Sequence, residues 1–314
     1  LRIIFAGIPF LAVYNVYSAA LRGIGDSRAP FLAILFSSAV NVVLDILFVA
    51  CLHWGVKGAA AATVISQAAM TAFLILYAVA KHPLLRFCPG GRLLYGNALE
   101  QGFRLGIPPM IQSSVSAFGS LLLQNFMNGF GTQTVAAITT AYRVDTIILL
   151  PIINLGSGIS TIVARNHGAG EEGRAKRVLA VGTAMMAAVS LFLTILVIPT
   201  GGRVIAMFGV GAGAVGIGQD FFQRIACFYV VFGLATAVRG YLEGIGDVLY
   251  SSIAGIVSLI SRILASYGMA AVFGNMVIAY AEAFSWGVLL ALYLARMGWR
   301  RYRMGGPIDS PATP

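Results

Sequence analysis

Long apolar stretches separated by short polar connections dominate the chain. A helix needs about 20 apolar residues to cross the hydrocarbon core of a bilayer. By that length the sequence predicts an all-α polytopic membrane protein with about nine membrane-spanning helices. The predicted spans are 3–21, 30–52, 58–80, 105–128, 135–164, 178–199, 214–238, 249–273 and 276–295. The fifth is long and contains Pro151, which predicts a tilt or a break at that point.

The composition agrees with a membrane protein and argues against several soluble classes. Of the 314 residues, 59% are hydrophobic and 10% are charged, whereas soluble globular proteins carry about 25% charged residues. The net charge of +10 is spread over short connections and forms no basic patch with interleaved aromatic residues, so no nucleic-acid partner is indicated. The sequence also lacks HExxH, GxSxG and phosphate-loop motifs. Neither an enzyme nor a bound cofactor is therefore expected.

Basic residues are distributed unevenly over the predicted connections. Fifteen Lys and Arg residues fall in the connections on one side of the membrane and three on the other. The remaining three, Arg143, Arg224 and Arg262, fall within predicted spans. Because cytoplasmic connections carry the excess of basic residues, the C-terminus is predicted to be cytoplasmic. The expected location is the cytoplasmic membrane, crossed several times.

A hexapeptide occurs twice along the chain. Residues 21–26 read LRGIGD, and residues 242–247 read LEGIGD, 221 positions later. Each copy follows one predicted span and precedes two more, which is typical of the parallel repeats in secondary transporters. The second copy follows the fourth of six spans, whereas the first copy follows the first span. We therefore expect three further spans before residue 1, so that the chain is an N-terminally truncated fragment of a twelve-helix protein.

The longest connection is predicted to separate two helical bundles. It contains two prolines and a Gly-Gly pair, which are typical of a linker. The predicted organisation is an incomplete N-terminal lobe with helices four to six (1–80), a cytoplasmic interlobe linker (81–104), a C-terminal lobe with helices seven to twelve (105–297) and a cytoplasmic tail (298–314).

Asp45 is the leading candidate for a functional side chain. It lies in the middle of the predicted span 30–52, where a carboxylate is costly unless it is paired, hydrated or protonated. Asn41 precedes it by four residues and shares its helix face. Such a carboxylate suits proton exchange, and with amide and hydroxyl oxygens nearby it could instead bind Na⁺. Polar packing between helices is the alternative.

Several segments resemble the multidrug and toxic-compound extrusion (MATE) family. The more specific ones are LRGIGDSRAP at 21–30, NVVLD at 41–45 and GVKGAAAATVISQ at 55–67; GFG with VAA within 129–137 and NHGAG at 166–170 are less specific. The resemblance extends to about residue 297. It implies twelve helices in two six-helix lobes and a cation-coupled export of organic cations through a cleft between the lobes.

The resemblance also implies where the coupling ion, H⁺ or Na⁺, binds. Many bacterial members use a site in the N-terminal lobe, and the matching positions here are Asn41, Asp45 and Thr63. That site also uses a carboxylate of the first helix, which this chain does not include. Other members use a Glu of helix seven and an Asp of helix ten, but the corresponding stretches 112–120 and 228–236 contain no carboxylate. The N-terminal site is therefore favoured.

Two groups of charged residues fall within the spans of the second half. Arg262 and Glu282 occupy the repeat positions of Asn41 and Thr63, at offsets of 221 and 219 residues. Their opposite charges indicate an intramembrane ion pair between helices eleven and twelve. It could be structural, or it could repel cations from this lobe or assist binding. Asp145 lies two residues after Arg143 and points to a different helix face, which predicts separate partners and a structural role.

A set of polar and aromatic side chains could line the cleft that the resemblance implies. The residues are Tyr14, Gln112, Gln124, Asn125 and Asn154. Hydrogen bonding between helices explains them equally well. The expected partners are a small organic cation and the lipid bilayer, and the protein is expected to be a monomer.

Two other functions stay open at this point. A flippase for lipid-linked precursors has a related fold and would need a wide basic cleft. A non-transporting membrane scaffold would need an apolar interior, with Asp45 facing lipid or a sealed packing interface.

Overall fold

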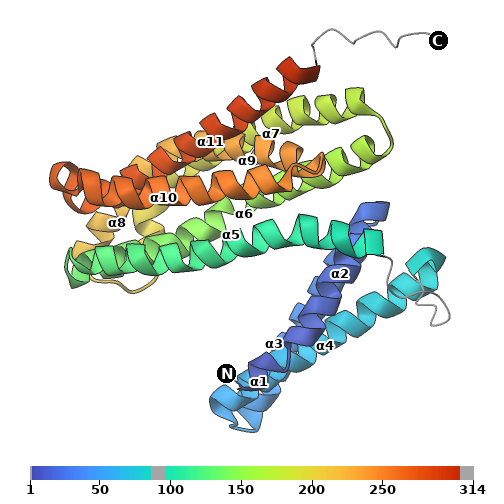
Figure 1. Ribbon diagram of the computed structural model, residues 1–314. Coiled ribbons are helices and arrows are strands. Elements are labelled where there is room, and N and C mark those ends of the chain that lie inside the picture. The colour runs from blue at the N-terminus through green and yellow to red at the C-terminus, as the bar shows by residue number, and fades with distance from the viewer. Residues whose placement is uncertain (1, 86–95, 305–314) are drawn as a thin grey trace, which may run out of the picture. The chain divides into compact units, whose positions relative to one another are not determined.

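The computed structural model describes residues 2–85 and 96–304, which form helices joined by short turns and contain no strand (Figure 1). The chain divides into two compact units, residues 1–94 and 95–314. The prediction of an all-α protein is confirmed. The predicted linker contains this division, and its residues 86–95 lie outside the described residues.

Unit 1 contains three long helices. Its elements are α1 (Arg2–Phe5), α2 (Ile8–Ile24), α3 (Arg28–Asp45), a π-helical turn (Ile46–Cys51), α4 (Gly55–Lys81) and a 3₁₀ turn (Pro83–Leu85). Both α2 and α3 pack on α4. Small residues let the helices approach: a side chain at Gly58 of α4 would lie 3.0 Å from the Cβ atom of Phe48. In membrane helix bundles, small residues at the interfaces let the backbones approach closely.

Unit 2 contains the remaining helices. They are α5 (Gly96–Asn128), α6 (Thr132–Gly168), α7 (Glu172–Ala206), α8 (Ala212–Ile225), α9 (Tyr229–Gly244), α10 (Val248–Phe273) and α11 (Val277–Met304), with 3₁₀ turns at Ala226–Phe228 and Gly274–Met276. The centre of the unit is formed by α6, α7 and α9, while α10 packs on α5 and α11. Close approach again depends on glycine, because a side chain at Gly240 would collide with the backbone carbonyl of Gly156.

Seven helical stretches of the described residues are long and apolar enough to cross a membrane. They are Arg2–Ile24, Arg28–Cys51, Gly55–Lys81, Thr132–Gly168, Glu172–Ala206, Ala212–Gly244 and Val248–Arg300. The last stretch contains both α10 and α11, and α5 is not among the seven. The number of nine spans therefore stays a prediction.

Three details differ from the predicted elements. Helix α6 runs through Pro151 without a break, which membrane helices tolerate because neighbouring groups satisfy the freed carbonyl. Residues 96–104 of the predicted linker belong to α5; the hydropathy pattern missed them because this stretch contains Glu100 and Arg104. The predicted span 214–238 consists of α8 and α9, separated by the 3₁₀ turn.

The two hexapeptides adopt the same backbone geometry. Gly25 and Gly246 have φ angles of 96° and 84°, a left-handed conformation that glycine adopts without strain. The Gly25 and Gly246 amides donate to the carbonyls three residues earlier, at 3.1 and 3.0 Å. The next amides, of Asp26 and Asp247, donate five residues back at 2.9 and 2.8 Å. Each hexapeptide therefore ends its helix with the same glycine C-terminal motif.

The repeat extends to the helix pairs that follow the hexapeptides. In unit 1 the Ser37 hydroxyl donates to the Ser66 carbonyl at 3.0 Å, joining α3 to α4. In unit 2 the Ser258 hydroxyl donates to the Ser285 carbonyl at 2.8 Å, joining α10 to α11. Ser258 and Ser285 are the repeat partners of Ser37 and Ser66, at the offsets of 221 and 219 residues. The α3–α4 and α10–α11 pairs therefore share one register.

The aspartates that end the hexapeptides anchor the last helix of each unit. Asp26 accepts hydrogen bonds from the Tyr77 hydroxyl at 3.0 Å and from His82 Nε2 at 3.1 Å. Asp247 accepts from Arg296 Nε at 2.7 Å and from Arg300 Nη1 at 3.1 Å. The hydrogen bond from His82 is the main reason that the pKa of Asp26 lies below its ordinary value, with smaller lowering effects from Ala29, Tyr77 and Lys81.

We expect the Asp26 anchor to stabilise unit 1 in a pH-dependent way. Because the pKa of Asp26 is lower in the folded chain, its contribution is complete above the ordinary carboxyl pKa of about 4 and disappears as the pH falls through the lowered value. Asp26→Asn should lower the melting temperature by about 2–4 °C at neutral pH, and this difference should shrink in acid. Thermal melting of both proteins over a pH series measures it; an effect that grows towards low pH would contradict the assignment.

Candidate functional site

The first candidate site lies where α3 changes its winding. Asp45 is the last residue of α3, and the π-helical turn Ile46–Cys51 follows directly. Inserted π-helical turns occur frequently at functional sites because they interrupt the regular hydrogen-bond ladder. Gly58 accommodates this wider turn, since Phe48 lies against its backbone.

Two polar atoms at this site have no partner among the described residues. They are Asp45 Oδ1 and Asn41 Nδ2, both buried within the structure and one helical turn apart. An unpaired carboxylate oxygen is expensive in a membrane interior, which makes Asp45 a candidate for ion binding or protonation. The Asn41 amide can turn about its terminal bond to present its oxygen instead, so both side chains can offer oxygen ligands.

Thr63 belongs to the same level of the helix pair. Ser37 and Ser66 are joined by their hydrogen bond, Asn41 lies one turn after Ser37, and Thr63 lies three residues before Ser66 on the antiparallel helix. This register sets Asn41 and Thr63 level with each other. The Thr63 hydroxyl donates to the Ala59 carbonyl at 2.9 Å, so its oxygen can still accept a hydrogen bond or bind a cation. No hydrogen bond joins Thr63 to Asp45 in the described part of unit 1.

Arg262 and Glu282 lie together in unit 2. Arg262 Nη2 of α10 is 3.1 Å from Glu282 Oε2 of α11 and 2.7 Å from the Tyr142 hydroxyl of α6. The guanidinium also lies over the Tyr142 ring, 5.6 Å from its centroid. The structure therefore brings together the two charges that the repeat singled out. It adds Tyr142, which the sequence did not single out because its contact with Arg262 spans 120 residues.

Asp145 forms another buried polar contact of unit 2. The Tyr229 hydroxyl of α9 donates to Asp145 Oδ1, and the two residues are 4% and 0% exposed. The sequence predicted separate partners for Arg143 and Asp145. The two side chains lie in different environments, since Asp145 is buried whereas Arg143 is exposed. One sign in the sequence indicated that Asp145 could be functional, because it is a carboxylate within a predicted membrane span.

The candidate cleft residues fall in different environments. Tyr14 is buried in the core of unit 1, where its hydroxyl donates to the Pro30 carbonyl at 3.4 Å. Gln124 donates to Asn128 on its own helix at 3.4 Å, and Asn154 donates to the Leu150 carbonyl at 2.8 Å. Asn125 and Asn154 are exposed on unit 2. Gln112 packs against Gly255 of α10. Structural hydrogen bonding therefore accounts for Tyr14, while Asn125 and Asn154 remain accessible on their own unit.

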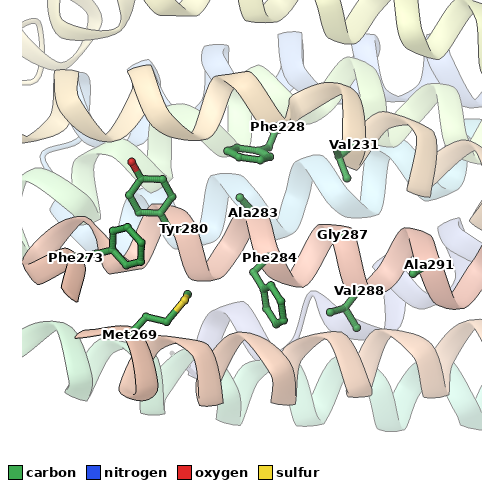
Figure 2. Close-up of a pocket in the computed structure, with 10 residues that line it drawn as sticks. All are labelled: Phe228, Val231, Met269, Phe273, Tyr280, Ala283, Phe284, Gly287, Val288 and Ala291. Carbon is green, nitrogen blue, oxygen red and sulfur yellow. The ribbon is translucent and has the colours of Figure 1, made fainter. Parts of the chain in front are cut away.

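An apolar pocket of about 600 Å³ opens between α9, α10 and α11 of unit 2 (Figure 2). Phe228 and Val231 lie on one side, and Tyr280, Ala283 and other α11 residues lie opposite. The pocket contains no charged side chain. All of its lining residues belong to unit 2, and none is a candidate cleft residue.

These features define a class of protein: an integral membrane protein with a repeated helical unit and polar side chains buried within candidate spans. The family model named MatE matches residues 1–47 and 108–268. The chain belongs to this family, and the resemblance seen in its motifs is confirmed. Members of the family are transporters rather than enzymes.

Curated relatives and solved structures agree with this assignment. The chain is 31% identical over 260 residues to the probable multidrug resistance protein YpnP of Bacillus subtilis, covering 82% of this chain and 58% of the relative. It is 23% identical over 263 residues to the probable multidrug resistance protein NorM of Thermotoga maritima, covering 82% and 56%. A crystal structure of MATE in the bent conformation shares the fold, with a TM-score of 0.86, 20% identity, and coverage of 96% and 67%. The chain thus spans a little over half the length of the YpnP and NorM relatives.

Proposed function

We propose that this chain is part of a cation-coupled antiporter that exports organic cations or drugs across the cytoplasmic membrane. The observation that carries the proposal is that Asp45 Oδ1 and Asn41 Nδ2 are both buried without a hydrogen-bond partner in the described structure. Relatives described as probable multidrug resistance proteins support the class of cargo. As a whole protein it would act as a monomer, with its C-terminus in the cytoplasm, as the distribution of basic residues indicates.

In the proposed mechanism Asp45 binds the coupling ion. A proton would neutralise the carboxylate directly, whereas Na⁺ would need several oxygen ligands, to which Asn41 and Thr63 can contribute. Either ion removes the cost of an unpaired charge within the membrane. Ion binding and cargo binding would then alternate, so that movement of the ion down its gradient drives export of the cargo.

An imposed gradient tests the proposal and identifies the ion. The complete protein is reconstituted into vesicles with a fluorescent organic cation, and either a proton or a Na⁺ gradient is applied. We expect one gradient to drive transport and its collapse by the matching ionophore to stop it. Dye transport that proceeds equally well in the absence of both gradients would overturn the proposal. Movement of a lipid-linked precursor in place of the dye would identify a flippase, and no movement of either cargo would identify a scaffold.

A further inference from the structure

Unit 2 contains a buried cluster of ionisable groups that the proposed coupling site does not use. Its members come from four helices: Tyr142 and Asp145 of α6, Tyr229 of α9, Arg262 of α10 and Glu282 of α11. Hydrogen bonds join Arg262 to both Tyr142 and Glu282, and join Tyr229 to Asp145. The two pairs also act on each other, since Asp145 interacts electrostatically with both Arg262 and Glu282.

The charges of this cluster do not balance. It contains two carboxylates, on Asp145 and Glu282, and one guanidinium, on Arg262. Arg262 Nη2 already forms an ion pair with Glu282 Oε2 at 3.1 Å. Among the described residues no Lys, Arg or His forms an ion pair with Asp145. With every group in its ordinary ionised state the cluster would therefore carry one net negative charge inside a membrane-spanning bundle, which is strongly unfavourable.

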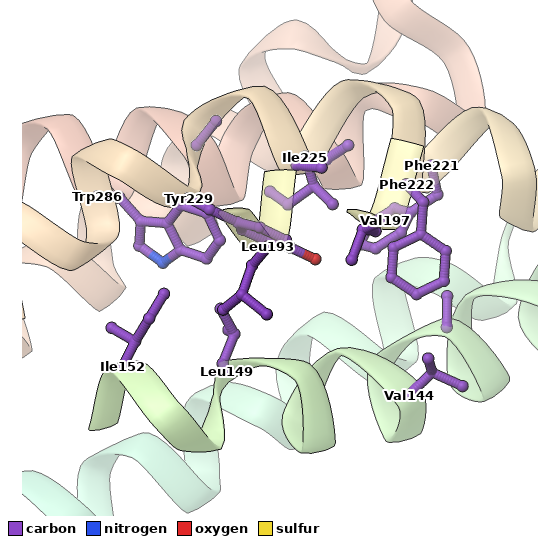
Figure 3. Close-up of a cluster of buried hydrophobic side chains, with 14 of the residues drawn as sticks. Val144, Leu149, Ile152, Leu193, Val197, Phe221, Phe222, Ile225, Tyr229 and Trp286 are labelled. Atoms are coloured by element: carbon purple, nitrogen blue, oxygen red, sulfur yellow. The ribbon is translucent and has the colours of Figure 1, made fainter. Parts of the chain in front are cut away.

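Neighbouring elements supply no compensating charge. The charged residues of α7 lie at its two ends. On α8, Asp220 and Arg224 pair with each other at 3.6 Å, and their side chains are 55% and 33% exposed. Figure 3 shows Tyr229 among the apolar side chains of Leu149, Leu193, Ile225 and Trp286.

We propose that Asp145 is a proton-binding site of unit 2, which balances the cluster by holding one proton. This site is separate from the coupling site proposed in unit 1. The proton from solvent binds Oδ2 of Asp145, which has no hydrogen-bond partner among the described residues. Oδ1 continues to accept the hydrogen bond from Tyr229. Arg262 and Glu282 then remain as a neutral ion pair.

A proton fits this position better than a metal cation. Among the described residues, Asp145 has one hydrogen-bond partner, the Tyr229 hydroxyl. The oxygens of Tyr142 and Glu282 contact Arg262. A metal ion such as Na⁺ would require several oxygen ligands. A proton needs only the carboxylate itself, and the Tyr229 hydroxyl orients the acceptor.

Infrared spectroscopy of the purified, reconstituted protein tests this proposal without measuring transport. A protonated carboxyl group has a carbonyl stretching band that ionised carboxylates lack. In the Asp45→Asn background, which removes any contribution from the unit 1 site, we expect such a band at neutral pH and expect Asp145→Asn to remove it. Tyr229→Phe should shift its frequency, because the hydrogen bond to Asp145 is lost. Glu282→Gln should also remove the band, because Arg262 is then free to balance an ionised Asp145.

The matched control is Asp220→Asn on α8, which removes an exposed, paired carboxylate and should leave the band unchanged. Thermal melting shows whether each variant is folded; Tyr229→Phe keeps all charges and therefore serves if Asp145→Asn does not fold. A band that is insensitive to Tyr229→Phe would place the proton on Glu282 and overturn the proposal. Absence of the band from the Asp45→Asn protein would overturn it as well. Loss of the band only when Na⁺ is added would identify a metal cation site instead.

Discussion

Asp45→Asn should reduce ion-driven export of an organic cation by about 10- to 100-fold. This range corresponds to losing one charge-assisted interaction, worth about 1.5–3 kcal/mol. The amide has nearly the shape of the carboxylate but neither takes up a proton nor carries the charge that attracts Na⁺. The measurement is gradient-driven transport by the complete protein in vesicles.

Stability should respond to this substitution in the opposite direction. Asp45 Oδ1 is buried without a partner in the described structure, so replacing the charge with a neutral amide removes an unfavourable group. We therefore expect an unchanged or higher melting temperature together with lost coupling. Functional side chains commonly lower the stability of the fold in this way. If export persists at its original rate, Asp45 does not bind the coupling ion.

Two further variants sharpen this test. Asn41→Ala and Thr63→Val each remove one oxygen and should have a smaller effect than Asp45→Asn, because neutral groups bind an ion less strongly than a carboxylate does. If the coupling ion is a proton, Thr63→Val should have almost no effect on export. If the coupling ion is Na⁺, the same substitution should weaken its binding. Asp220→Asn, at an exposed ion pair of α8, is the control and should export normally.

Arg262→Met should destabilise unit 2 by about 3–5 kcal/mol, the range expected when one partner of a buried ion pair is removed. The substitution leaves Glu282 and Asp145 buried without the only guanidinium that interacts with them in the described structure. It also removes the hydrogen bond and the ring contact with Tyr142. Thermal or denaturant unfolding of the purified protein measures the loss.

A double-mutant cycle separates charge from packing. Arg262→Met combined with Glu282→Gln removes both charges, and the double variant should recover much of the stability that the single variant loses. Arg224→Met is the surface control; it breaks an exposed pair with Asp220 and should cost at most about 1 kcal/mol. A loss in the double variant equal to the sum of both single losses would show that the pair has no coupling energy.

The repeat makes the two sites comparable. Asn41 and Thr63 of α3 and α4 occupy the positions that Arg262 and Glu282 occupy in α10 and α11. The shared Ser37–Ser66 and Ser258–Ser285 contacts show that the helix pairs around these positions have the same register. These positions of unit 1 carry neutral polar side chains close to Asp45, whereas those of unit 2 carry an ion pair.

Much of the local structure could be predicted from the sequence alone. Apolar length predicted the helices, because a membrane interior requires every backbone group to be bonded within its own helix. The hexapeptide predicted the internal repeat, since a glycine at the left-handed position ends both helices in the same way. Asp45 stood out because a charge within an apolar span is costly wherever the chain folds. The repeat also paired Arg262 with Glu282, as their register relates them to Asn41 and Thr63.

Other features were decided only by the tertiary structure. Tyr229 reaches Asp145 across 84 residues, and Tyr142 reaches Arg262 across 120, so no local periodicity reveals either contact. The charge imbalance of unit 2 became visible only when four helices brought these groups together. Local sequence determines where a helix forms and which side chains it carries, because those depend on nearby backbone bonds and hydrophobicity. Which buried polar group meets which partner depends on how the helices pack, and that is a property of the whole fold.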